Sequence, residues 1–125
     1  MSRKHTQQMN AIEKSFIHGY IRKNAEKAQY SAVSHFYDRA SERHFSITDA
    51  VAALKGGLVV EVHNDKNPSL RALVRDAKGT CVVVDLRGMD VVTVYYNNPE
   101  DKHDTLNWNL YRWSQDVVEL VKGLR

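Results

Sequence analysis

The sequence has a single cysteine and no long apolar run, and each shortage excludes a class of protein. Cys81 has no second cysteine to pair with, and its position before Val82 predicts a small core or half-buried residue rather than a catalytic thiol. No stretch approaches the roughly eighteen apolar residues of a membrane-spanning helix. The first eight residues have no apolar run behind their charges and do not resemble a secretory signal. We therefore expect a cytoplasmic protein, from a bacterial cell or a phage-infected host, with no membrane partner.

The motifs that hold nucleotides and metals are also missing. The chain has no glycine-rich phosphate loop, no paired-histidine zinc-protease motif, and no Cys/His spacing that suits zinc. Its six histidines do not pair with acids at ligand spacing. We expect no metal site and no cofactor, and any chemistry is expected to be acid–base work by side chains.

Length and composition predict one α+β domain spanning residues 1–125. At 125 residues, with 42% hydrophobic and 26% charged residues, the chain suits one ordered domain. We divide it into an N-terminal helical extension (1–30), a core (31–97), and a loop with a C-terminal helix (98–125). Residues 1–45 carry eight Lys/Arg against four acids, and residues 46–125 carry ten against eleven. The basic half indicates either attraction to phosphate or a solvated helix face.

Apolar spacing predicts helices on both sides of a sheet-forming region. The first helix is expected from Ser2 to about Gln29, with a buried stripe of Met9, Ile12, Phe16 and Tyr20. The others are expected over 31–44, over 47–55 with Ser46 and Asp49 at its start, and from about 106 to 122 with an apolar face that includes Trp113.

Alternating apolar residues predict a four-stranded antiparallel meander over 58–63, 70–76, 80–86 and 91–97. If helices cover one sheet face, the other is left partly open. By strand parity this open face gathers polar side chains: Glu61, His63, Arg71, Arg75, Thr93 and Tyr95. Arginines bind phosphate and Tyr95 can stack on a base. The alternative is a solvated face with cross-strand ion pairs, such as Glu61 with an arginine.

A histidine and two arginines share one face of the expected 31–44 helix. His35 is followed at four and eight residues by Arg39 and Arg43. The imidazole could transfer a proton at neutral pH, and the arginines could stabilise a phosphorane. The alternative is an exposed basic stripe.

These residues carry a resemblance to a small bacterial and phage domain family. Ser34–Val51, followed by Ala53–Gly57, is similar to its opening pattern, and Val91–Tyr95 to its last strand. The family is grouped with BrnT-like and RelE-like toxins, in the Barnase–EndoU–colicin–RelE superfamily of metal-free RNases. The resemblance covers about residues 33–97, and Phe36 departs from the small residue usual after the histidine.

The resemblance implies a metal-independent endoribonuclease of the toxin type, in which the 2′-hydroxyl attacks the adjacent phosphate and leaves a cyclic phosphate. It implies catalytic roles for His35, Arg39, Arg43, Thr93 and Tyr95. We expect the RNA, a tRNA or an mRNA, to be bound by a further basic set: Arg71, Arg75, His63, Lys23 and Lys27. An antitoxin or immunity protein is the expected partner.

Two alternatives keep the same fold without catalysis. One is a nucleic-acid-binding protein, indicated by the basic N-terminal half. The other is a phage accessory protein that binds and inhibits a host protein, indicated by the long first helix and by Trp108, Tyr111 and Trp113.

Overall fold

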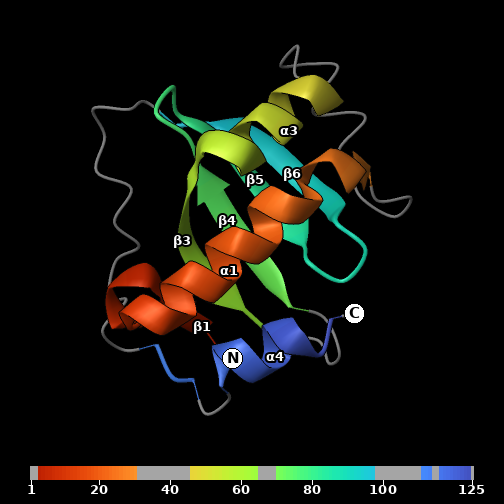
Figure 1. Ribbon diagram of the computed structural model, residues 1–125. Helices are drawn as coiled ribbons and strands as arrows, with labels where there is room; N and C mark the ends of the chain where they lie inside the picture. The colour runs from red at the N-terminus through yellow and green to blue at the C-terminus, as the bar shows by residue number, and fades with distance from the viewer. Residues whose placement is uncertain (1–2, 31–45, 65–69, 98–110, 114–115, 125) are drawn as a thin grey trace.

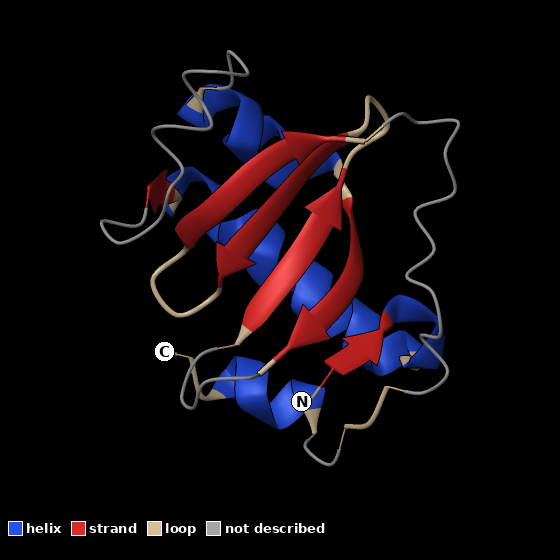
Figure 2. Ribbon diagram, turned by 180° about the vertical axis from the view of Figure 1, so that it is seen from behind, coloured by secondary structure: helices blue, strands red, loops and turns tan. Residues whose placement is uncertain are grey.

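A six-stranded open sheet, with helices on one of its faces, organises the described chain (Figures 1 and 2). The structure is a computed structural model and describes residues 3–30, 46–64, 70–97, 111–113 and 116–124. The strand order is β1-β3-β4-β5-β6-β2. The α+β class expected from the sequence is confirmed, but the sheet is mixed and larger than the expected four strands.

The four expected strands form the centre of the sheet. They are β3 (Leu58–His63), β4 (Arg71–Arg75), β5 (Thr80–Asp85) and β6 (Asp90–Tyr96), each antiparallel to the next. Asp76 closes the turn before β5, because its Oδ1 accepts from the N–H groups of Lys78 and Thr80. Turn residues and alternation thus specify this meander locally.

Two short strands at the edges were not expected. β1 (Arg3–His5) is antiparallel to β3, and β2 (Gln29–Tyr30) is parallel to β6. β1 falls inside the helix expected from Ser2 to about Gln29, and β2 begins at its last residue, so that prediction is wrong at its two ends. Strands this short are held by their partners, and local sequence carries little signal for them.

The first helix, α1 (Ala11–Asn24), begins at a capping box. Asn10 Oδ1 accepts from the N–H of Glu13, and Glu13 Oε1 accepts from the N–H of Asn10. A turn, η1 (Thr6–Gln8), precedes the helix, and another, η2 (Ala25–Lys27), follows it.

The buried stripe of α1 differs from the expected one. Glu13, Ile17 and Ile21 are buried at four-residue steps, whereas Ile12 is 63% exposed and Phe16 39% exposed. Glu13 takes a place in this stripe because its carboxylate lies 2.7 Å from Lys4 Nζ of β1. A prediction that counts only apolar residues places every glutamate in solvent. The buried face that it predicts for α1 is therefore turned about the helix axis relative to the observed one.

Helices α1 and α3 (Ile47–Gly56) cover one face of the sheet (Figure 1). The capping box expected at Ser46 and Asp49 is present. The core between helices and sheet is valine-rich on the strand side, with Val59, Val62, Val74, Val82, Val84, Val91 and Val94 all buried.

Bulges in two strands decide which valines are buried. In β3, Val59 lies opposite Val74 and Glu61 opposite Leu73, so Val60 is an extra residue. In β6, Val92 is the extra residue between Val91 and Thr93. Strict alternation in this strand predicts Leu58, Val60 and Val62 on the covered face and Val59 on the open one. The bulge instead buries Val59 and leaves Leu58 63% exposed, so the prediction is wrong over residues 58–60.

The C-terminal helix is shorter than expected in the part described. α4 (Val117–Lys122) begins after Asp116, whose Oδ1 accepts from the N–H of Val118, and it packs on α1. Residues 111–113 are extended, and the N–H of Arg3 donates to the carbonyl of Arg112 over 3.1 Å. Trp113 is therefore not on a helix. The helix expected over 31–44 lies outside the described residues.

Among the helices that the structure describes, none has the length and apolar character needed to cross a bilayer.

Candidate functional site

The sheet face opposite α1 and α3 collects polar side chains from four neighbouring strands. Figure 2 views this face, with the described helices behind the strands. His63 lies opposite Arg71, and Arg75 lies opposite Cys81. Cys81 in turn lies opposite Tyr95. Directly opposed residues point to the same side of a sheet, so these side chains share one surface. We call it the open face.

Strand β1 extends the open face by two residues that the sequence did not reveal. Arg3 lies opposite His63, and His5 lies opposite Glu61. The sequence signal for this strand is the alternation of side chains within Arg3-Lys4-His5. The expected first helix includes this segment, so the strand is not predicted. The open face therefore carries three arginines (Arg3, Arg71, Arg75) and two histidines.

An ion pair organises the β1 side of this face. Arg3 Nη1 lies 3.6 Å from Glu61 Oε2, and the Glu61 side chain is 7% exposed against 31% for Arg3. The Arg3 guanidinium also lies 5.9 Å from the centre of the Tyr111 ring. Glu61 therefore compensates one arginine and is itself shielded. Asp85 lies directly opposite Arg71 on the same face, and His5 is only 3% exposed. The partly exposed basic side chains of the face are therefore Arg3, His63, Arg71 and Arg75.

Tyr95 and Cys81 are held in their neutral forms. Burial, followed by the nearby Cys81 and Glu61, raises the pKa of Tyr95 to about 12, although Arg75 opposes the shift. Burial also raises the pKa of the Cys81 thiol, whose Sγ donates to the carbonyl of Gly79 over 3.6 Å. Tyr95 is therefore a neutral phenol at physiological pH, and Cys81 is a buried thiol, as the sequence indicated, with no thiolate character.

The residues predicted as a site divide into three groups. His63, Arg71, Arg75, Thr93 and Tyr95 share the open face, with Thr93 opposite Val83 of β5. Lys23 is exposed on α1 and Lys27 is exposed in η2. Both belong to the helical layer behind the sheet, so the predicted RNA-binding set is not one surface (Figure 2). His35, Arg39 and Arg43 lie outside the described residues.

The open face offers the groups that phosphodiester recognition needs. Guanidinium groups bind phosphate oxygens in a bidentate manner, and imidazoles exchange protons near neutral pH. A half-buried neutral tyrosine can stack on a base or donate a hydrogen bond. Within the described residues there is no group of three or more His, Cys, Asp or Glu side chains that could hold a metal ion.

A comparison with known protein families, with curated protein sequences and with solved structures finds no match for this chain.

Proposed function

We propose that the open face binds RNA and that the chain is a metal-independent endoribonuclease. The observation that carries the proposal is the strand register, which gathers Arg3, Arg71 and Arg75 around His63 and Tyr95 on one sheet face. The toxin-type resemblance supports the same class of chemistry independently of this register.

The chemistry requires a positioned phosphate and two proton transfers. The 2′-oxygen of one ribose forms a bond to the adjacent phosphorus while the bond to the 5′-oxygen breaks. One group takes the 2′-hydroxyl proton and another gives a proton to the departing 5′-oxygen. The products are a 2′,3′-cyclic phosphate and a 5′-hydroxyl, with no metal and no oxidant involved.

Among the described residues, His63 is the proposed proton-transfer group and Arg71 the proposed phosphate ligand. They are directly opposed on β3 and β4, so one phosphate can lie between the imidazole and the guanidinium. Arg75 lies on the same face four residues along β4, in reach of a neighbouring phosphate. His35 stays the predicted second proton-transfer group.

To test for cleavage, the purified protein is incubated with total RNA and a labelled tRNA in excess EDTA. His63→Ala, His35→Ala and Arg71→Ala are run beside a Lys23→Ala/Lys27→Ala control, which removes two exposed cations from the helical layer. We expect cyclic-phosphate ends with the wild type and the control, and at least a hundredfold slower cleavage for the histidine variants. If the wild type and its variants bind RNA but none of them cleaves it, the chain is a non-catalytic RNA-binding protein.

Salt dependence separates RNA binding from protein binding. Phosphate contacts make affinity fall steeply with salt, and Arg71→Ala should reduce the slope of log K against log salt by about one. A failure to bind any RNA of a broad panel at low salt would contradict the proposal and favour an inhibitor of a host protein.

A further inference from the structure

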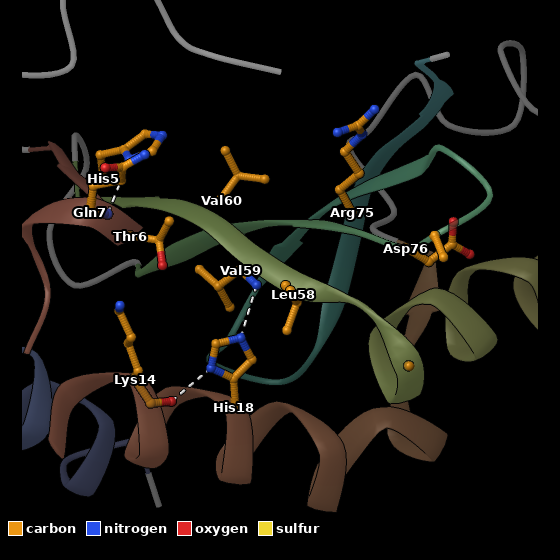
Figure 3. Close-up of a pocket in the computed structure, with 12 residues that line it drawn as sticks. His5, Thr6, Gln7, Lys14, His18, Leu58, Val59, Val60, Arg75 and Asp76 are labelled. Atoms are coloured by element: carbon orange, nitrogen blue, oxygen red, sulfur yellow. Dashed lines mark hydrogen bonds between the residues drawn. The ribbon is translucent and has the colours of Figure 1, made fainter. Parts of the chain in front are cut away.

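A recess lies where strand β1 leaves the edge of β3. β1 pairs with Glu61–His63, so the first half of β3 has no strand beyond it within the described residues. A pocket of about 620 Å³ occupies this position, within the range of small-ligand sites. Figure 3 shows side chains from η1, α1, β3 and the end of β4 around it.

One wall of the pocket is apolar and open. Leu58 and Val60 of β3 line it, and Leu58 is 63% exposed beside a strand that is otherwise largely buried. Gly56 also lines it, and a Cβ added there would meet no atom within 4 Å. The space beside Gly56 is therefore open, and the exposed Leu58 side chain next to it offers an apolar surface.

The opposite rim carries Lys14, whose ammonium group is not in an ion pair with any described residue. Lys4, Lys55 and Lys122 each pair with a glutamate, whereas Lys14 forms no ion pair with any residue that the structure describes. The side chains of Lys14 and Thr6 point toward one another across the recess in Figure 3. Both end in hydrogen-bond donors, which is a pairing that suits a phosphate oxygen.

The other polar residues of the rim have defined roles. Asp76 Oδ1 accepts from two N–H groups of its own turn. His18 uses both ring nitrogens, one toward Lys14 O and one toward Val59 N (Figure 3). The cationic groups at the recess are therefore Lys14 at one end and Arg75 at the other.

The pocket is continuous with the open face. His5, Val60 and Arg75 line the pocket and stand on the open-face side of β3, while Lys14 and His18 lie on the α1 side (Figure 3). We infer that this pocket is a nucleotide subsite, in which a base packs on Leu58 and Val60 and its phosphate binds Lys14. The inference rests on the proposed function, because it lets an RNA strand on the open face continue over the edge of β3.

Binding of adenosine 5′-monophosphate, followed in ¹H–¹⁵N NMR spectra, tests the pocket by itself. We expect shifts at the amides of Lys14, Gly56 and Leu58, and at least tenfold weaker binding in Lys14→Ala and in Gly56→Leu, which fills the recess. Adenosine and inorganic phosphate should each bind more weakly than the monophosphate. Lys23→Ala, at an exposed position of α1 outside the pocket, should leave monophosphate binding unchanged.

A short single-stranded oligonucleotide distinguishes RNA from a free nucleotide. Loss of oligonucleotide affinity in both pocket variants supports a subsite for RNA. If the pocket variants lose affinity for the monophosphate but not for the oligonucleotide, the subsite is supported and its continuity with the open face is overturned. Absence of monophosphate shifts at the pocket, or equal affinity in folded Lys14→Ala and Gly56→Leu, overturns the inference. Failure of the open-face proposal is seen separately, as unchanged oligonucleotide binding in Arg71→Ala.

Discussion

His18 accepts a hydrogen bond from the backbone N–H of Val59, with 3.0 Å between Nε2 and the amide nitrogen. Its other ring nitrogen, Nδ1, lies 2.7 Å from the carbonyl oxygen of Lys14. A carbonyl can only accept and an amide N–H can only donate, so the ring is the neutral tautomer with its proton on Nδ1. A helix side chain thus supplies the hydrogen-bond acceptor that a neighbouring strand would otherwise supply beside the first half of β3. This edge N–H is then not available to pair with another chain.

Replacing His18 should therefore destabilise the fold from a position on the helix surface. His18→Ala leaves the Val59 N–H without its acceptor, at a cost of about 1–3 kcal/mol. Urea denaturation should show a lower midpoint with an unchanged slope. Ser15→Ala, at an exposed position of the same helix, controls for the gain in helix propensity on placing alanine there. Equal midpoints for the two variants would show that the edge contact contributes nothing.

Two adjacent glycines should differ in how much stability an alanine substitution costs. A Cβ on Gly57 would lie 2.5 Å from Ala53 O and 2.8 Å from Val74 Cγ1, while one on Gly56 meets open space. Gly57→Ala must push α3 away from β4 and should cost about 1–3 kcal/mol. Gly56→Ala should stay within about 0.5 kcal/mol of wild type. Thermal denaturation of the pair measures the difference, and a tolerated Gly57→Ala would mean that α3 and β4 approach less closely.

Glu13 joins α1 to β1 and should matter more than an exposed glutamate. It accepts from the N–H of Asn10 and pairs with Lys4 at a site where the Glu13 side chain is 9% exposed. Glu13→Ala leaves the Lys4 ammonium half-buried without its partner and removes the acceptor of the Asn10 N–H in the capping box, which should cost about 2–4 kcal/mol.

The matched control is Glu26→Ala, which removes the partner of Lys55 in an ion pair whose glutamate side chain is 77% exposed. Its urea midpoint should equal that of wild type, because exposed ion pairs contribute little. If the two variants were equally stable, Glu13 would not anchor β1.

The elements that could be predicted from sequence are those with local signals. Ser46 and Asp49 predicted the start of α3, and alternation located the four central strands to within one residue at every end. β1 and β2 could not be predicted in this way, because each exists through pairing with a strand more than fifty residues away in sequence.

The difference between local signals and pairing of distant segments also explains which residues of the candidate site could be predicted. Parity alone grouped Glu61, His63, Arg71 and Tyr95, since these residues lie in stretches of the meander that the two bulges do not interrupt. Arg3 and His5 joined them through an unexpected strand, and Lys14 gained its position at the pocket from the packing of α1 against β3. A bulge such as that at Val60 shifts the faces by one residue and leaves no local signal in an all-apolar run.

The last prediction concerns alkaline pH. Tyr95 has a pKa of about 12 in the folded chain against a usual value of 10.0, with burial as the main cause. Between these values the unfolded chain has lost this proton and the folded chain retains it. Stability from Tyr95 is therefore complete below pH 10 and is lost as the pH rises from 10 through 12.

Thermal midpoints measured from pH 9 to 11.5 should accordingly fall more steeply in wild type than in Tyr95→Phe, which has no phenol to titrate there. Tyr96→Phe, which removes a hydroxyl from a ring that is 60% exposed on the same strand, is the matched control for the loss of one phenol. Absorbance of tyrosinate near 295 nm, as a difference between wild type and Tyr95→Phe, should place the transition above pH 11. If Tyr95→Phe kept the full alkaline loss of stability, the buried phenol beside Cys81 and Glu61 would not be its source, and the open face would be more hydrated around Tyr95 than the strand packing indicates.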